Sequence, residues 1–242
     1  MGLSPVEKRS LPDKVFDQLT SEIISGRYAP GAMIPSEREL ADILTVNRHV
    51  VREAIKRLQQ IGLLSVTQGG RTTVLDFHRT AGLDMLAIVA GHAEANEPPV
   101  ALLVAVLEMR AGIGTDVARL CAQRAGSHIR RGLLTIAEEL RAAGEGPELL
   151  NLDQRFWQLT LDGAGNIAYQ LAFNSLIRAV HSLHELSVSW LEQELKHGDY
   201  RRPIAAAIAA GDPDRAAAAA RVALEVPELS GTLALHSRSP AG

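Results

Sequence analysis

The sequence predicts a mainly α-helical protein with one short β-hairpin near its N-terminus. Three observations support this prediction. Apolar residues recur at helical spacing in the first sixty residues, two β-rich runs flank Gly69-Gly70, and helical patterns separated by glycine and proline fill the chain from about residue 100. We expect a first domain over residues 1–75, a linker and connecting helix over 76–99, an all-α bundle of six or seven helices over 100–229, and a flexible tail over 230–242.

The N-terminal region is predicted to form three helices followed by a hairpin. Ser36 and Glu39 form the pattern of a capping box at the start of the second helix. Asn47 is a favourable N-cap for the third. Two β-rich runs follow, so the order of elements is that of a winged helix-turn-helix. The expected bounds are residues 13–25 for the first helix, 47–60 for the third, and 63–67 and 71–75 for the two strands.

Cationic side chains are concentrated on one face of the predicted third helix. At about 100° per residue, Arg48, His49, Arg52 and Lys56 fall on one side, and the apolar residues, such as Val51, fall on another. A solvated charged surface is the alternative interpretation. Because the cationic stripe starts at the N-terminus of the helix and a hairpin with a glycine tip follows, we favour DNA binding.

The overall composition gives no hint of nucleic acid, because 25 Lys and Arg face 28 Asp and Glu. The charge is uneven, however, with a net of +1 over residues 1–76 and −4 over residues 77–242. The single cysteine, Cys121, argues for a reducing compartment. No apolar run approaches the roughly 20 residues that span a bilayer, and the first residues lack the apolar core of a signal peptide. We therefore expect a cytoplasmic protein without a membrane partner.

Four segments of the first domain carry a specific pattern, in spacing as well as in composition: PSERELA at 35–41, VNR at 46–48, VREAIKRL at 51–58 and GLL at 62–64. They resemble the GntR family of bacterial transcription regulators, over residues 13–75. The helical second half resembles the FadR subfamily, whose C-terminal domain binds an effector and dimerises. Residues 77–86 are similar to the linker of fatty-acid regulators and mce-operon repressors in that subfamily. The resemblance implies operator DNA, an effector and a second copy of the chain as partners.

The resemblance also implies which residues meet the operator, namely those of the second helix, the start of the third and the tip of the hairpin. An arginine can bond two acceptors on guanine in the major groove, and glycine lets the backbone approach DNA closely. Lys56 and Arg57 lie deeper in the helix and are expected to contact phosphate or to be surface residues. The implied operator contacts are Arg38, Asn47, Arg48, His49, Arg52, Gln68 and Gly69.

In the metal-binding branch of the subfamily, an Asp-x-x-x-His pair and two later histidines hold a metal ion. Here Asp153 is present, but Trp157, Arg201 and Ala223 stand at the other three positions. One oxygen ligand cannot hold a zinc-type ion, so we predict no metal and no cofactor. His181 and His184 could act as substitutes, but they lack a matching acid, and a role in the core or in the lining of a pocket is favoured.

A bulky Trp157 in place of a ligand predicts an apolar cavity that buries an effector. The resemblance implies that Arg110 faces this pocket and pairs with an acidic effector, although a salt bridge to a neighbouring helix is the alternative. Phe156, Trp157, Tyr169 and Phe173 are concentrated in eighteen residues, and ordinary core packing is the alternative to a role of these aromatic residues in the pocket. The candidate effector-binding residues are Arg110, Asp153, Trp157, Tyr169, Phe173 and His181.

A long-chain fatty acyl-CoA fits an apolar lining and an anionic head group, and its binding would release DNA by reshaping the helical domain. Two alternatives remain open: the effector is a small carboxylate, or the helical domain serves only dimerisation. An enzyme is not expected. The segment GAGNIA at 163–168 meets a loose dinucleotide-binding pattern but follows a helix, not a strand. The helices expected in this half span residues 102–123, 130–142, 149–161, 167–195, 201–210 and 214–224.

Overall fold

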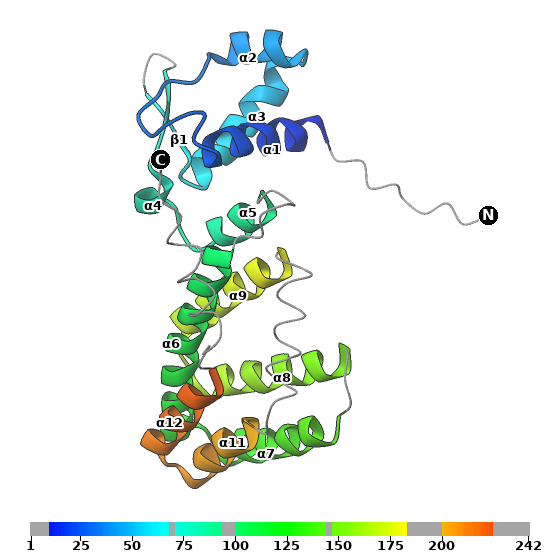
Figure 1. The fold of residues 1–242 in the computed structure, drawn as a ribbon, viewed down its shortest axis with the longest axis vertical. Helices are drawn as coiled ribbons and strands as arrows, with labels where there is room; N and C mark the ends of the chain where they lie inside the picture. Colours follow the sequence, from blue (N-terminus) through cyan, green and yellow to red (C-terminus); the bar gives the residue numbers. More distant parts are fainter. Residues whose placement is uncertain (1–9, 68–70, 93–99, 144–146, 183–199, 225–242) are drawn as a thin grey trace, which may run out of the picture. The chain divides into compact units, whose positions relative to one another are not determined.

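The computed structural model of the chain describes residues 10–67, 71–92, 100–143, 147–182 and 200–224. The chain forms two compact units, Met1–His92 and Ala93–Gly242. Helices dominate both units, and the first also holds one antiparallel hairpin (Figure 1). The predicted fold class is therefore confirmed. None of the helices in the described ranges is long and apolar enough to cross a membrane.

The helices of the first unit begin at side chains that cap them. Ser10 and Ser36 each form a capping box with the residue three positions later, and the Asn47 side chain accepts a hydrogen bond from the backbone N–H of Val50. Because Ser10 is the cap of the first helix, that helix starts two residues earlier than the apolar pattern predicts. Thr45, in the left-handed conformation with φ 55°, makes the turn between the second and third helices. The three helices are α1 (Leu11–Ile24), α2 (Glu37–Leu44) and α3 (Arg48–Gln60).

The hairpin pairs β1 (Leu64–Val66) with β2 (Thr72–Val74) in antiparallel register, with Leu64 opposite Val74. The segment before α2 lies along the other edge of β2, where the backbone N–H of Ile34 donates to the carbonyl oxygen of Thr72 at 3.0 Å. The strand β2 therefore has a hydrogen-bonded neighbour along each of its edges. The tip of the hairpin, residues 68–70, lies outside the described residues.

The segment expected to be a linker folds onto the first unit. It forms α4 (Phe77–Thr80) and α5 (Met85–Gly91), and Met85 is buried in the core of the helix-turn-helix. The Thr80 hydroxyl donates to the carbonyl oxygen of Gly62 at 2.8 Å. A Cβ on Gly62 would lie 2.8 Å from the Thr80 carbonyl oxygen, and Gly62 has φ +78°, so glycine is needed for this contact.

The second unit is all-helical in its described residues, as predicted, and is built around one long helix, α6. Figure 1 shows α7 and α8 side by side, with α8 crossing α6 and α12 running along it. A Cβ on Gly163 of α8 would lie 2.5 Å from Sγ of Cys121 on α6, so the glycine permits a close crossing. The expected helix 167–195 is described as far as Ser182. The described helices are α6 (Val100–Arg124), α7 (Ser127–Ala142), α8 (Pro147–Ala164), α9 (Ile167–Ser182), α11 (Arg201–Ala210) and α12 (Pro213–Leu224).

Candidate DNA interface and effector pocket

Helix α3 has one buried and one exposed face. Val51, Ala54 and Leu58 are fully buried against the rest of the first unit, whereas Arg48 and His49 are exposed. The Asn47 side chain begins the helix, and its Oδ1 accepts the N–H of Val50 at 3.0 Å. The capping bond occupies that oxygen and leaves the two amide N–H groups as donors toward a ligand in front of the helix N-terminus.

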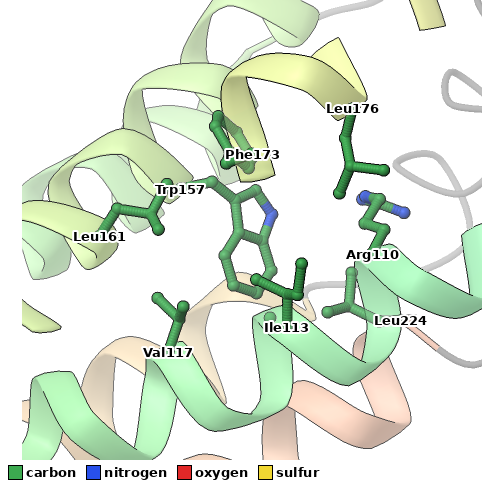
Figure 2. Close-up of a pocket in the computed structure, with 9 residues that line it drawn as sticks. Arg110, Ile113, Val117, Trp157, Leu161, Phe173, Leu176 and Leu224 are labelled. Carbon is green, nitrogen blue, oxygen red and sulfur yellow. The ribbon is translucent and has the colours of Figure 1, made fainter. Parts of the chain in front are cut away.

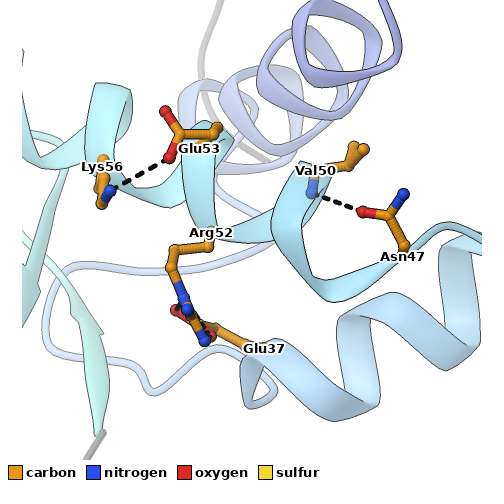
Figure 3. Close-up of polar contacts among 6 residues, drawn as sticks. All are labelled: Glu37, Asn47, Val50, Arg52, Glu53 and Lys56. Atoms are coloured by element: carbon orange, nitrogen blue, oxygen red, sulfur yellow. Dashed lines mark hydrogen bonds and ion pairs between the residues drawn. The ribbon is translucent and has the colours of Figure 1, made fainter.

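Arg52 is held by a carboxylate of the preceding helix. Its Nε lies 3.1 Å and its Nη2 2.9 Å from Oε2 of Glu37 (Figure 3). This hydrogen bond raises the pKa of the Arg52 guanidinium further, and the nearby Glu37 charge adds to the effect. The pair joins α2 to α3 on the exposed side of the helix-turn-helix, so Glu37 fixes the direction in which Arg52 extends.

The other candidate cations have different surroundings. Arg38 and Arg48 are exposed and make no hydrogen bond or ion pair within the described part of the chain. Lys56 pairs with Glu53 one turn earlier in α3, at 3.1 Å (Figure 3). Arg57 instead binds α1, where Nη1 lies 2.6 Å from Oδ1 of Asp13, and its guanidinium lies over the ring of Phe16 at 4.3 Å. Arg57 therefore serves the packing of α1 on α3. Gln68 and Gly69 lie outside the described residues.

In the second unit, Asp153 forms a buried ion pair with Arg201. Nε of Arg201 on α11 lies 2.6 Å from Oδ1 of Asp153 on α8, and the two side chains are 3% and 6% exposed. The guanidinium also lies 5.5 Å from the ring centre of Trp157. No group of three or more His, Cys, Asp or Glu residues lies close enough to hold a metal ion within the ranges that the structure describes. The carboxylate that could bind a metal instead neutralises an arginine, so this donor set does not fit a metal centre.

An apolar pocket lies beside Trp157, between α6, α8, α9 and α12 (Figure 2). Of the candidate effector residues, Arg110, Trp157 and Phe173 line it. Tyr169 is tied to α6 instead, where its hydroxyl donates to Oδ2 of Asp116 at 2.9 Å. His181 lies on α9, but its side chain is outside the described residues. The pocket is therefore assembled from part of the predicted set, without Asp153 or Tyr169 among its lining residues.

The remaining lining residues are aliphatic and were not predicted: Ile113, Gly114, Val117, Leu161, Leu176 and Leu224. The helical spacing from Arg110 through Ile113 to Val117 is the sequence signal that could have found the α6 wall. A Cβ on Gly114 would lie 2.4 Å from Cδ1 of Leu224, so this glycine lets α12 close against α6. The cavity volume is about 20 Å³, room for about one water molecule, so a lipid can enter only if the helices around it separate.

Comparison with known proteins agrees with the division of the chain into a helix-turn-helix unit and an all-helical unit. Residues 11–74 match the model of "Bacterial regulatory proteins, gntR family", and residues 105–226 match the FCD domain. The chain is 36% identical over 234 residues to the HTH-type transcriptional regulator Mce2R of Mycobacterium tuberculosis, covering 95% of each chain. It is 29% identical over 160 residues to the fatty acid metabolism regulator protein of Edwardsiella ictaluri, covering 66% of this chain and 65% of that one.

The fold also resembles that of a solved structure from a study of Lar and the Listeria monocytogenes agr system. The TM-score is 0.58 at 14% identity, and the likeness covers 95% of this chain and 99% of that one. The relatives are transcription regulators rather than enzymes. The helix-turn-helix with its hairpin and the all-helical second unit occupy the matched segments in the same order. The chain is therefore a member of the gntR family of bacterial regulatory proteins, and its second unit contains an FCD domain.

Proposed function

We propose that this chain is a cytoplasmic transcription regulator that binds a palindromic operator as a homodimer and releases it when a lipid effector enters the second unit. The effector class is a long-chain fatty acyl-CoA or a related lipid. The observation that carries the proposal is the pocket beside Trp157, whose lining is aliphatic and aromatic apart from Arg110. Such a lining suits a hydrocarbon chain, and a guanidinium suits an anionic head group.

For DNA, the operator contacts we propose are Arg38, Asn47, Arg48, His49 and Arg52 on the two helices, with Gln68 and Gly69 at the wing. Arg48 is exposed and makes no hydrogen bond or ion pair in the part of the chain that the structure describes, so it is available to guanine. Arg38 is also exposed, and its charge lowers the pKa of the neighbouring Glu39. The domains that we propose are the DNA-binding domain over residues 1–75, a linker with connecting helix over 76–99, the effector domain over 100–229 and a tail over 230–242.

The release mechanism follows from the size of the pocket. Because a cavity of about 20 Å³ cannot hold an acyl chain, a bound lipid must separate helices that pack together without it. Ligand binding and helix arrangement are then coupled. In a dimer, a change in this arrangement alters the spacing of the two DNA-binding domains and thereby the affinity for two fixed half-sites.

The DNA proposal is tested by selecting binding sites from random DNA and measuring affinity by fluorescence anisotropy. We expect a palindrome, and we expect Arg48→Ala to weaken binding by about 1–3 kcal/mol and to relax preference at one base pair. Arg79→Ala is the matched control, because Arg79 is exposed on α4, which contacts Gly62 after the end of α3, away from Arg48. Wild-type affinity in Arg48→Ala, or a selected site without two-fold symmetry, would contradict the proposal.

The effector proposal is tested by titrating oleoyl-CoA into the complex of protein and selected operator. We expect release, with a midpoint at least about tenfold higher in Arg110→Leu, since a charge-assisted contact is worth about 1.5–3 kcal/mol. Arg131→Leu, on the exposed surface of α7, should behave as the wild type. No release at saturating oleoyl-CoA refutes the lipid effector. Release by gluconate would then indicate a small carboxylate, and no response to either would leave dimerisation as the role of the second unit.

A further inference from the structure

The side chain of Trp157 carries a buried hydrogen-bond donor, its indole N–H. The side chain is 5% exposed, and its Nε1 has no hydrogen-bond partner among the described residues. A buried N–H without a partner is unfavourable and uncommon in folded proteins. It persists at functional positions when the surrounding structure holds the side chain in place.

The indole is held in place from several sides. The guanidinium of Arg201 lies 5.5 Å from its ring centre, and the ring of Phe156 meets it edge to face at 5.8 Å. The benzene edge faces α6, where the position of a Cβ on Gly114 lies 3.3 Å from Cη2. This edge of the indole is therefore packed closely against α6.

The nitrogen edge of the ring is directed toward the pocket. Figure 2 shows Nε1 on the side of the indole on which Arg110 and Leu176 lie, away from Leu161. Among the described lining residues, Arg110 and Trp157 are the only ones with polar side chains, and both are donors. Within the lining residues that the structure describes, no side chain offers a carboxylate or amide oxygen to the indole N–H.

We propose that the indole N–H of Trp157 donates a hydrogen bond to an oxygen atom of the effector. The ligand class is an amphiphile that carries a carboxylate or thioester oxygen next to its hydrocarbon chain, with the oxygen between Trp157 and Arg110. This inference rests on the proposed function, because it takes the pocket to be the effector site. It adds a requirement that hydrophobic burial alone does not impose: an alkyl chain without an acceptor oxygen is rejected because it leaves the donor buried and unpaired.

The test uses the full-length protein with decanoate, decanoyl-CoA and decylamine as probes. Calorimetry gives the affinities, and a ¹H–¹⁵N spectrum reports the indole N–H of Trp157, identified as the signal that Trp157→Phe lacks. We expect the indole proton to shift downfield on binding of decanoate or decanoyl-CoA, with decylamine binding at least about tenfold more weakly. The better of the two oxygen-bearing probes shows whether a free carboxylate or a thioester carbonyl is the acceptor.

Two replacements separate the donor from the shape of the ring. Trp157→Phe removes the N–H and some volume, and β-(3-benzothienyl)alanine at the same position replaces the N–H with sulfur at nearly constant size. We expect both to lose about tenfold in affinity for the oxygen-bearing probe. If the probes bind without an indole shift, or the benzothienyl protein binds them normally, the inference is wrong while the lipid effector stands. If neither oxygen-bearing probe binds, the inference fails, and the titration with oleoyl-CoA decides the lipid effector separately.

Discussion

Replacing Arg201 with methionine should destabilise the second unit strongly. The guanidinium is 3% exposed and compensates the carboxylate of Asp153, which is 6% exposed, across a 2.6 Å contact between α11 and α8. Methionine fills a similar space but leaves a buried carboxylate without its counter-charge. Removing one partner of a buried pair costs about 3–5 kcal/mol, and the loss of the contact between Arg201 and the Trp157 ring adds to this.

Urea denaturation followed by tryptophan emission measures the effect. The chain has two tryptophans, and both belong to the second unit, so the signal reports this unit rather than the DNA-binding domain. Arg202→Met is the matched control on the same helix. The Arg202 side chain is 62% exposed and its Nε lies 3.4 Å from a carboxylate oxygen of Glu138, so the loss should be below about 1 kcal/mol.

The double variant Asp153→Asn with Arg201→Met separates charge compensation from packing. If the cost of Arg201→Met arises from the uncompensated carboxylate, neutralising Asp153 should restore most of the free energy of unfolding. A loss below about 1 kcal/mol in Arg201→Met would refute the reasoning. A double variant less stable than Arg201→Met would refute it as well, because packing rather than charge would then dominate.

Three further predictions concern single side chains. Hydrogen bonds from Ser10 and then from Arg57 lower the pKa of Asp13 from 3.8 to about 2. The first unit should therefore lose stability as the pH falls from about 4 to 2. In Asp13→Asn, circular dichroism should show a stability that depends less on pH over this range. Burial raises the pKa of the Cys121 thiol to about 12, so Ellman's reagent at pH 8 should react at least about a hundredfold more slowly with the native protein than with the protein in urea; equal rates would contradict the burial. Glu37→Gln should strengthen binding to random DNA severalfold and reduce the ratio of operator to random-DNA affinity, because it removes a negative charge and frees the arginine that it holds; an unchanged ratio in anisotropy titrations would argue against a positioning role.

Local signals in the sequence predicted the helix-turn-helix well. Caps such as Ser36 and Asn47 act within three residues, so the starts of α2 and α3 follow from the sequence directly. α4 was not predicted, because a helix of four residues shows no periodicity and depends on its contact with Gly62. The predicted starts were accurate where the cap was identified in the sequence, as at Ser36 and Asn47, but not at Ser10.

Pairings between distant residues could not be predicted in this way. Glu37 and Arg52 are 15 residues apart, and Asp153 and Arg201 are 48 apart, so neither ion pair shows in a local pattern. Two of the predicted effector residues, Trp157 and Phe173, did indicate the region of the pocket. The contribution of α12 to the pocket, through Leu224, was missed because a leucine on an alanine-rich helix gives no sign of which cavity it lines.

The buried pair between Asp153 and Arg201 also restricts how the second unit can evolve. A change of Arg201 to histidine alone would remove a permanent charge before a metal ion could replace it, because tryptophan and alanine occupy the other two ligand positions. A step that replaces Arg201 alone therefore passes through a protein destabilised by several kcal/mol. Lineages with the arginine should accordingly keep Asp153 and Arg201 or lose both together.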